Sequence, residues 1–525
     1  MSQHTISLFQ YLEKEQISID KAEFEFQMQS HPDYPSLLAI SDTLSFFNIH
    51  NGVMRVEFSD IDLLSDRFVA LMKDENSNPQ LFIIERIENN YFYSYDKKPI
   101  AILKSEIERR WLRIVLLVEK SENGEETKPR INNWLWFLSI VIMLLLVMVL
   151  GSLKIDLSTK LFLVLPAVGL LFSVAALKDL FGSKSELLNS FCNMTVSTSC
   201  VTVVGSSKWK IFEIVNFSDL SMVFFGSQFL GLLAFLLSGS SASYFNIQQI
   251  LLISSVPVLF ASLYYQKYVE KKWCPICLVI ISVILLELGY LFVLRSTFFT
   301  LAVMPIVIYG LVFISVLLAW FALKKLLLSK KELKEFQIKG TRFMRNYYVF
   351  KNSLVASAKT NFHSLSSGNL VVGNENSPLK ITLVTNPFCG HCKEAHSIVE
   401  EIYKKNKDNV YVDFRFNFKI EHGNSDFEKV HQKLICIYYD NGQEAFLKAL
   451  HNWFENNDES QLVVCEKSTI NDVKINEILN EQYLMNRANN IQFTPSIIIN
   501  GFEYPKMFDR NQLRFYISDL IEDSF

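Results

Sequence analysis

The chain has 525 residues, of which 50% are hydrophobic and 20% are charged, and its formal net charge is −3 at pH 7. This composition excludes a disordered chain and a small disulfide-stabilised domain, and the length allows several domains. The balanced charge offers no basic face to a phosphate backbone, so we expect no nucleic-acid partner. The high apolar fraction with few charged residues points to a membrane protein.

The N-terminal region, residues 1–125, has the pattern of a small α/β domain. Helical periodicity occurs near Ile6–Glu15 and over Tyr34–Phe47. Runs rich in apolar and β-branched residues then predict strands at Arg67–Met72, Gln80–Arg86, Tyr91–Tyr95 and Trp111–Val118.

The central region, residues 133–325, predicts an all-α membrane bundle with six spans. The apolar runs carry little or no charge and cover 134–153, 161–177, 220–238, 250–265, 275–294 and 298–323. Their lengths are close to the about 20 residues that a helix needs to cross a bilayer. Helices buried in a soluble core would show a polar face, which these runs lack. Met1–Lys14 lacks the basic, apolar and small residues that follow one another in a signal peptide. We therefore expect the first apolar run to direct membrane insertion.

The placement of the cysteines predicts redox chemistry. All eight follow residue 191, and they form the pairs Cys192/Cys200, Cys274/Cys277, Cys389/Cys392 and the wider Cys436/Cys465. A thiol relay needs a pair in a loop, a pair fixed at the membrane and a pair in a soluble domain. Zinc binding is the alternative, but no His-x3-5-His or second neighbouring Cys-x-x-Cys completes four ligands. We therefore predict redox-active pairs and no metal.

The sequence around Cys389 predicts a reactive thiolate. Leu379–Thr385 alternates as a strand, Asn386–Cys392 (Asn-Pro-Phe-Cys-Gly-His-Cys) forms a turn, and the apolar spacing that follows predicts a helix. Cys389 would then lie at a helix N-terminus, where free N–H groups and the helix dipole favour the thiolate. His391 would add a second stabilising group. Stabilising the dithiol makes the disulfide more oxidising, so this pair would donate disulfides readily.

Residues 379–525 resemble the thioredoxin fold with a helical insertion. The resemblance rests on the strand, Cys-Gly-His-Cys and helix, on Phe-Thr-Pro-Ser-Ile-Ile-Ile-Asn-Gly at 493–501, and on Cys436–Phe454, which is similar to the insertion of periplasmic thiol oxidases. It implies that Thr494-Pro495 has a cis peptide bond and contacts thiol substrates; an ordinary strand-edge proline is the alternative. Cys436 and Cys465 fit a disulfide and two buried thiols equally well.

The membrane region resembles the vitamin K epoxide reductase family over residues 158–295. An apolar run with Gly169-Leu-Leu-Phe-Ser-Val-Ala-Ala-Leu precedes a loop that holds Cys192 and Cys200. Cys274-Pro-Ile-Cys277 then opens the fourth span of this core. The two cysteine spacings, in this order and with these spans, carry the resemblance.

The resemblance to this family implies a quinone, menaquinone or ubiquinone, near Cys277. It also implies that Cys192 and Cys200 pass electrons to the Cys274/Cys277 pair. The sequence departs from the family at two places, because Leu220–Gly226 contains no quinone-contacting Asn and Ile281 stands where the family has Tyr.

These pairs predict an electron path from protein thiols to a lipid-soluble acceptor. A disulfide is broken by attack of a thiolate, so each transfer brings a mobile pair to a fixed one. A substrate thiolate would attack Cys389, the reduced domain would reduce the loop disulfide through Cys192, and Cys200 would attack Cys274 and release Cys277. The predicted reaction converts the dithiols of reduced exported proteins and a quinone into disulfides and a quinol.

The N-terminal region contains the segment Tyr34-Pro-Ser-Leu-Leu-Ala-Ile-Ser-Asp-Thr-Leu-Ser-Phe-Phe-Asn-Ile. This segment resembles the papain-like peptidases that trim double-glycine leaders. Tyr34 or a neighbour stands at the position of the nucleophilic cysteine, and Gln80-Leu-Phe-Ile-Ile stands where the family has its histidine. Without these groups the Cys/His mechanism is excluded. A peptide-binding or docking module and a structural appendage both remain open.

Glu287 and the linker are two further features. Glu287 lies ten residues past Cys277, about 15 Å deeper at helical rise. Quinone reduction consumes protons, but a protonated carboxyl group hydrogen-bonded inside the bundle is the simpler account, so we leave Glu287 out of the catalytic residues. Residues 326–378 are predicted to be a linker, charged and partly helical over Lys324–Phe350 and flexible over Asn361–Ser377, which raises the effective concentration of one redox domain at the other.

The predicted topology contains a conflict. Six spans put the three close cysteine pairs and both terminal regions on one side, which for an oxidase is the periplasmic side of a bacterial inner membrane. However, only Lys154, Lys160 and Arg295 mark the predicted cytoplasmic loops, and more basic residues lie on the other side. Two other functions remain open: a conduit that keeps exported thiols reduced, and a non-catalytic peptide-binding or export component.

Overall fold

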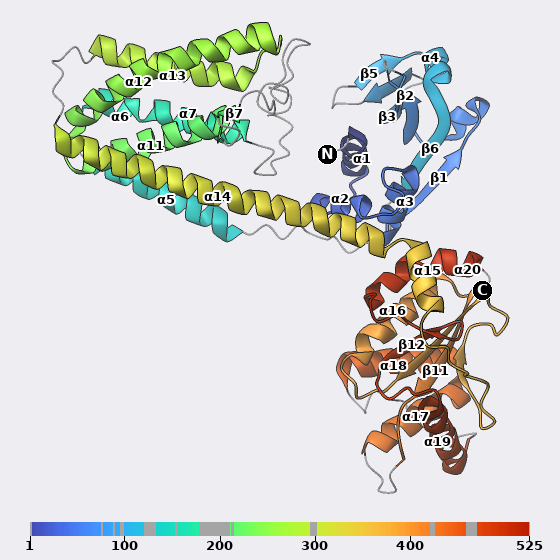
Figure 1. Ribbon diagram of the computed structural model, residues 1–525. Helices are drawn as coiled ribbons and strands as arrows, with labels where there is room; N and C mark the ends of the chain where they lie inside the picture. The colour runs from blue at the N-terminus through green and yellow to red at the C-terminus, as the bar shows by residue number, and fades with distance from the viewer. Residues whose placement is uncertain are drawn as a thin grey trace. The chain divides into compact units, whose positions relative to one another are not determined.

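The computed structural model describes residues 3–74, 77–87, 90–94, 99–119, 133–152, 156–177, 210–211, 215–294, 302–420, 426–457, 462 and 470–523. The chain, coloured by residue number in Figure 1, divides into two compact units by its internal packing. The first comprises Met1–Lys21, Arg55–Val115 and Glu122–Gln337, and the second comprises Ala22–Met54, Leu116–Ser121 and Ile338–Phe525. The N-terminal region therefore contributes residues to both units.

The N-terminal region is a small α/β domain, as its pattern predicts. Its elements are α1 (Gln3–Lys14), α2 (Lys21–Gln29), α3 (Leu37–Phe46), β1 (His50–Arg55), the 3-10 helix η1 (Phe58–Leu63), β2 (Arg67–Lys73), β3 (Pro79–Ile87), β4 (Asn90–Ser94), β5 (Pro99–Ile102), α4 (Lys104–Arg110) and β6 (Trp111–Glu119). The strands form one sheet in the order β1-β6-β2-β3-β4-β5. Helix α1 packs on β3, and Lys14 and Arg67 both bind Glu85. The likeness to leader peptidases stays a prediction.

The central region is a bundle of long apolar helices. Its elements are α5 (Asn133–Ser152), α6 (Leu157–Phe162), α7 (Val164–Ala176), β7 (Lys210–Ile211), β8 (Val215–Asn216), α11 (Phe217–Leu237), α12 (Ser241–Tyr264), the π-helical turn η3 (Tyr265–Val269), α13 (Pro275–Leu294) and α14 (Val303–Met344). Among the residues that the structure describes, five helical segments are long and apolar enough to cross a membrane: Leu157–Ala176, Ser218–Leu237, Ser241–Val269, Pro275–Val293 and Val303–Met344. Helix α5 covers the first predicted run, and the count of six spans stays a prediction.

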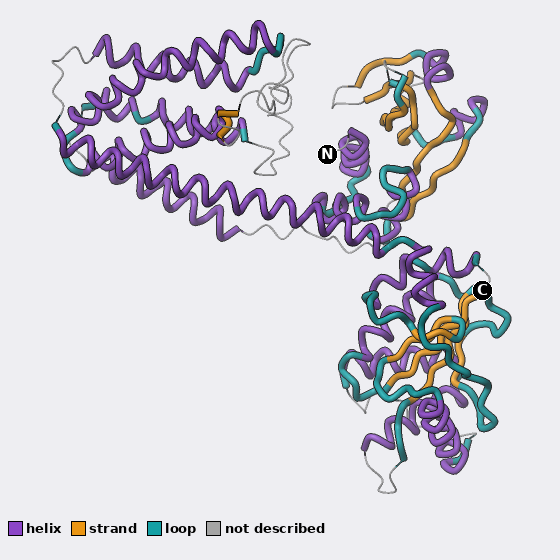
Figure 2. The backbone as a smooth tube through the Cα atoms, in the orientation of Figure 1, coloured by secondary structure: helices purple, strands orange, loops and turns teal. Residues whose placement is uncertain are grey.

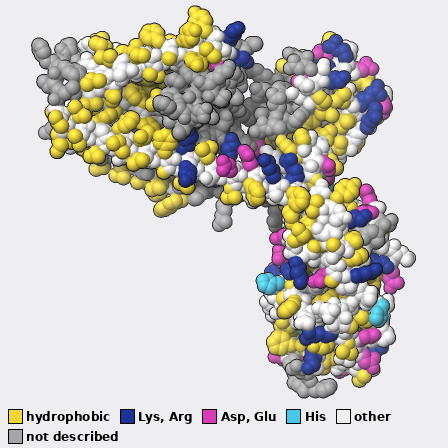
Figure 3. Space-filling view, viewed as in Figure 1, with side chains coloured by type: hydrophobic (Ala, Val, Ile, Leu, Met, Phe, Trp, Pro, Cys, Tyr) yellow, Lys and Arg dark blue, Asp and Glu magenta, His cyan; other side chains and the backbone are white. Residues whose placement is uncertain are grey.

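The outer surface of the bundle is apolar. Exposed large hydrophobic side chains on α13 and α14 include Leu285, Leu286, Phe292, Val293, Met304, Leu311, Ile314 and Leu318. Figure 3 shows hydrophobic side chains spread over this face. A continuous apolar surface of this kind is unfavourable in water and suits lipid.

The interior of the bundle is packed closely where small residues allow it. Helix α7 packs on α11 and α13, and α12 packs on the same two helices. At the contact of α7 with α11, a Cβ atom on Gly169 would come within 2.3 Å of the Phe225 ring. Glycine therefore lets these two helices approach each other.

The C-terminal region holds a five-stranded sheet between helices (Figure 2). Its elements are α15 (Tyr347–Val355), β9 (Leu370–Val372), β10 (Leu379–Thr385), α16 (Cys392–Lys405), β11 (Val410–Phe416), α17 (Asp426–Asn441), α18 (Gln443–Asn456), α19 (Asp472–Ala488), β12 (Ser496–Ile499), β13 (Phe502–Glu503), the 3-10 helix η5 (Arg510–Phe515) and α20 (Ile517–Glu522). The strand order is β13-β12-β10-β11-β9, with β10 parallel to β11 and antiparallel to β12. Helices α16 and α19 pack on β11.

The segment predicted as a linker is more ordered than its composition suggested. Helix α14 continues to Met344, because its polar half is rich in lysine, leucine and glutamate, which are good helix formers. Strand β9 lies within the serine- and glycine-rich part and pairs with β11 through Val412↔Val372. The thioredoxin-like sheet therefore includes residues before the predicted start at 379.

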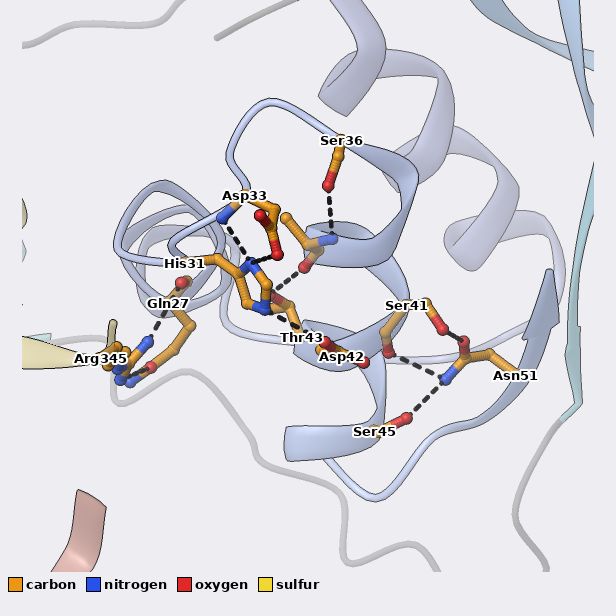
Figure 4. A network of polar contacts seen from close by, with 11 residues as sticks. Gln27, His31, Asp33, Ser36, Ser41, Asp42, Thr43, Ser45, Asn51 and Arg345 are labelled. Atoms are coloured by element: carbon orange, nitrogen blue, oxygen red, sulfur yellow. Dashed lines mark hydrogen bonds and ion pairs between the residues drawn. The ribbon is translucent and has the colours of Figure 1, made fainter. Parts of the chain in front are cut away.

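Within the second unit, the segment that carries α2 and α3 contacts the end of α14 and η5 (Figure 4). Arg345 donates hydrogen bonds to Gln27, and its guanidinium group lies 3.9 Å from the centre of the Phe515 ring. Phe46 of α3 stacks on Phe515 with ring centres 5.8 Å apart. In the same network, His31 Nε2 lies 3.1 Å from Asp42 Oδ2.

Candidate redox sites

The first site lies between β10 and α16 in the C-terminal region. Strand β10 ends at Thr385, the loop carries Cys389, and the helix begins at Cys392. Cys392 is fully buried and Cys389 is partly exposed. The Cys392 N–H donates to the Cys389 carbonyl oxygen over 2.9 Å. This is the strand, Cys-x-x-Cys and helix arrangement that the sequence predicted.

A distant part of the chain completes this site. The Thr494–Pro495 peptide bond is cis, as the resemblance implies, and its contact with thiol substrates stays a prediction. The Sγ atom of Cys389 lies 3.4 Å from the carbonyl oxygen of Thr494. Thr494 is thus placed against the exposed cysteine of the pair, where a thiol substrate would approach.

The two cysteines have different acidities. Burial opposes ionisation of Cys389, but hydrogen bonds from the Thr494 side chain, the Cys392 thiol and two backbone amides outweigh it, and the pKa of Cys389 is lowered. Burial is the main cause that raises the pKa of Cys392 to about 11. This difference would suit Cys389 to act as the nucleophile and leaving group of the pair and Cys392 to act as the buried resolving thiol, and both roles stay predictions.

His391 affects the acidity of Cys389 through its backbone amide. It is the N-cap residue of α16 and its side chain is exposed. Its amide is one of the two backbone groups that lower the pKa of Cys389. The predicted stabilisation by the imidazole ring stays a prediction.

Two buried histidines near this site were missed by the sequence reasoning. His396 lies one helical turn after Cys392, and its Nδ1 is 3.5 Å from Glu400 Oε2. His431 of α17 lies among Phe388, Phe416 and Phe418, and its Nδ1 is 2.7 Å from the Phe427 carbonyl oxygen. Burial is the main cause that lowers the pKa of each to about 4. Only the spacing of His396 from Cys392 was visible in the sequence.

The second site lies at the start of α13 in the membrane bundle. Cys274 is fully buried, and its N–H donates to Gln266 Oε1 over 2.9 Å. The Cys277 N–H donates to Cys274 Sγ over 3.3 Å. Cys274 packs in an apolar cluster with Ala175 of α7. The pair thus lies at the start of an apolar helix, as the sequence predicted.

A cavity of about 320 Å³ adjoins Cys277. The bundle helices α7, α11, α12, α13 and α14 line it, with these side chains in addition to Cys277: Ala176, Ser218, Leu220, Ser221, Phe224, Leu251, Ser254, Ser255, Val258, Leu259, Ser262, Ile280, Ile281, Ile284 and Phe313. The cavity is apolar with a few hydroxyl groups. It includes Ile281 and part of the 220–226 segment, the positions where the sequence departs from the vitamin K epoxide reductase pattern.

The remaining predicted residues are not all described. Cys192, Cys200 and Cys465 lie outside the described residues. Cys436 is disulfide-bonded, which excludes a free buried thiol at that position. Among the described residues, no group of His, Cys, Asp and Glu side chains could hold a metal ion.

Comparison with known families agrees with this architecture. Residues 160–292 match the vitamin K epoxide reductase family, and residues 365–519 match the thioredoxin family. No curated protein sequence matches the chain significantly. The protein thus joins a vitamin K epoxide reductase family domain to a thioredoxin-like domain. It is a membrane thiol–disulfide oxidoreductase.

Solved structures similar to the chain include thioredoxin-like proteins. Oxidised BdbD from Bacillus subtilis is 16% identical and aligns with 31% of this chain and 99% of its own, with a TM-score of 0.25. The thiol-disulfide exchange protein alpha-DsbA2 from Wolbachia pipientis is 20% identical over 34% of this chain and 96% of its own, with a TM-score of 0.23. DsbA2 from Pseudomonas aeruginosa is 16% identical over 31% and 98%, with a TM-score of 0.25.

Proposed function

We propose that the protein is a thiol:quinone oxidoreductase that makes disulfide bonds in exported proteins. The observation that carries this proposal is the cavity beside Cys277, because it offers the fixed cysteine pair an acceptor site within the lipid-embedded bundle. Its volume lies near the lower end of the about 300–1,000 Å³ found for small-molecule pockets. Apolar walls with a few serine hydroxyls suit an aromatic headgroup that carries carbonyl oxygens.

The chemistry of each pair supports the direction of transfer. The lowered pKa of Cys389 makes it a good leaving group, so a disulfide at Cys389/Cys392 passes readily to a substrate dithiol. The reduced pair then needs an oxidant, and we assign that role to Cys192/Cys200. Cys200 attacks Cys274, and Cys277 is released as a thiolate at the cavity. A quinone bound there supplies a two-electron acceptor.

We further propose six spans, with α5 as the first. An even number places the three close cysteine pairs and both terminal regions on one side, and the oxidase function requires that side to be the periplasm. Alkylation of Cys389 with a membrane-impermeant maleimide in intact and in permeabilised cells tests this orientation. Labelling only after permeabilisation of the inner membrane would contradict it.

Purified full-length protein, a reduced peptide and a water-soluble quinone test the function directly. We expect one quinol for each disulfide formed. Ile280→Trp, which fills the cavity, should lower quinol formation by about tenfold or more while Cys389 still exchanges with the peptide, whereas Leu286→Trp on the exposed face of α13 should leave quinol formation unchanged. Peptide reduction or oxidation that needs no quinone would favour the reductant conduit.

A further inference from the structure

A cluster of polar side chains lies inside the apolar bundle. Gln228 Nε2 of α11 donates to Glu287 Oε2 of α13 over 3.0 Å and to Gln248 Oε1 of α12 over 3.1 Å. All three side chains are completely buried. The Tyr244 hydroxyl donates to the Gln228 carbonyl oxygen, and the Tyr309 hydroxyl of α14 lies beside that of Ser227. Four helices therefore meet at one polar site.

The hydrogen bonds of this cluster are incomplete. Among the described residues, no partner is present for Glu287 Oε1, Gln228 Oε1, Gln248 Nε2 and the Tyr290 hydroxyl. A buried polar atom without a hydrogen-bond partner destabilises the folded protein. A carboxyl group kept only to hold helices together would be expected to use both of its oxygens. The open oxygen of Glu287 therefore points to a role beyond packing.

The cluster lies directly beyond the cavity on each of four helices. Three or four residues, one helical turn, separate Phe224 from Gln228, Leu251 from Gln248, Ile284 from Glu287, and Phe313 from Tyr309. Residues at this spacing share one face of a helix and lie about 5 Å apart along its axis. The first residue of each pair lines the cavity. Cys277 thus lies at one end of the cavity, and the polar cluster lies one helical turn beyond its opposite end.

We propose that Glu287 is the proton-holding group of this cavity and supplies a proton at the end opposite Cys277 when the bound acceptor is reduced. This inference rests on the proposed function. Burial in an apolar bundle favours the neutral carboxylic acid, which has a proton to give. The phenols of Tyr244 from α12 and Tyr309 from α14 are the titratable groups that interact electrostatically with Glu287.

The proton balance is simple. The Cys274/Cys277 dithiol loses two electrons and two protons as its S–S bond forms, and a quinone gains two electrons and two protons. Cys277 leaves the exchange with Cys200 as a thiolate and takes up the proton that Cys200 lost on attack, so one proton is available at the near end. Glu287 gives the second proton at the far end of the cavity and then regains a proton. The proton that Cys274 releases as the S–S bond forms balances this uptake. Glu287 is unchanged over the cycle, and it acts as a relay.

The test uses full-length protein in lipid nanodiscs with the Cys274/Cys277 pair reduced beforehand. Single-turnover quinol formation should fall by about tenfold or more in Glu287→Gln, which keeps the shape of the side chain but has no proton to transfer. Glu287→Asp should recover part of the rate and shift its pH profile. Exchange between Cys389 and a reduced peptide should be unchanged in both variants, since it occurs in the other domain.

A hydrophobic carbodiimide provides a readout that does not depend on turnover. It reacts with protonated carboxyl groups in membranes, so mass spectrometry should find it on Glu287, and added quinone should slow the labelling. This inference alone is overturned if Glu287→Gln has the turnover and pH profile of the wild-type protein, or if the carbodiimide does not label Glu287. If the wild-type protein forms no quinol, the proposed function fails as well. Should Glu287→Gln not fold, the labelling of the wild-type protein decides.

Discussion

The Sγ atom of Cys389 lies 3.4 Å from the carbonyl oxygen of Thr494, although the two residues belong to opposite ends of the thioredoxin-like domain. The contact brings the loop after β10 against the cis peptide bond before β12. The reactive sulfur is thus flanked by backbone and by the Thr494 side chain. The Thr494 side chain is one of the groups that lower the pKa of Cys389 against the opposing effect of burial.

The two cysteines of this pair should differ in alkylation. Cys389, whose pKa is lowered, should react with iodoacetamide at neutral pH, and Cys392, whose pKa is raised to about 11, should react far more slowly. Mass spectrometry of the reduced full-length protein at several pH values measures both rates. Thr494→Val should move the inflection of the curve of Cys389 alkylation rate against pH to higher pH. Equal rates at the two cysteines would contradict the assignment of nucleophile and resolving thiol.

Acid should destabilise the thioredoxin-like domain through its buried histidines. Burial lowers the pKa of His396 and of His431 to about 4, whereas an unfolded histidine titrates near 6.5. The unfolded state therefore takes up protons first, and the stability that each neutral ring contributes is complete above about pH 6.5 and is lost as the pH falls toward 4. The loss is about 3 kcal/mol for each ring.

Hydrogen exchange of the α17 amides in the full-length protein, compared at pH 7 and pH 5, checks the effect of His431. Exchange should be faster at pH 5 after correction for the intrinsic rate. His431→Phe, which keeps a ring among the surrounding phenylalanines, should reduce this pH dependence. An equal dependence in the variant would show that His431 is not responsible.

A buried ion pair should stabilise the contact of α14 with α11. Lys324 Nζ lies 2.6 Å from Asp219 Oδ2, and the Trp320 indole donates to the other carboxylate oxygen. Asp219→Ala leaves the lysine without this partner and should destabilise the bundle by about 3 kcal/mol. The thermal midpoint in detergent measures the change. Asp156→Ala, at an exposed aspartate before α6, is the control and should have little effect.

Two glycines in the bundle should respond oppositely to alanine. A Cβ atom on Gly169 would meet the Phe225 ring at 2.3 Å, so Gly169→Ala should cost about 1–3 kcal/mol. Gly289 of α13 has no atom within 4 Å of its added Cβ, so Gly289→Ala should be neutral or stabilising. Thermal unfolding in detergent compares the two variants. Similar midpoints would show that α7 and α11 can move apart at no cost.

Arg345 should hold the α2–α3 segment within the second unit. Its guanidinium group contacts both Gln27 and the Phe515 ring. Arg345→Ala should increase hydrogen exchange in α2 by about tenfold, while the reactivity of Cys389 stays unchanged. Lys339→Ala, at an exposed position on α14 shortly before Arg345, is the matched control. If hydrogen exchange in α2 is unchanged in Arg345→Ala, the contacts of Arg345 do not stabilise this segment.

The sequence could predict the elements whose local pattern is strong. Strands β2, β3, β4 and β6, with their apolar and β-branched runs, and the apolar helices were visible because burial sets their residue types. Strand β1 was not, since His50–Arg55 is polar and largely exposed. The extent of α14 was missed because a charged helix and a charged linker share the same composition.

The candidate sites show the same division. The cysteine pairs and Thr494-Pro495 occur in short motifs, so the sequence could reveal them. The cavity could not be predicted, because its lining comes from five helices and forms only when they pack. Glu287 was visible as a lone carboxyl group, but its partners Gln228 and Gln248 lie on other helices and follow no motif.

Helix α14 runs without interruption for 42 residues from the last apolar segment to Met344. Each residue of an α-helix turns the chain by about 100° and advances it by about 1.5 Å. One extra residue in the polar half would thus rotate every later residue of α14 by more than a quarter of a circle, whereas seven extra residues would nearly restore the original direction. An insertion or deletion in this helix therefore changes the direction of the side chains that follow it as well as the helix length.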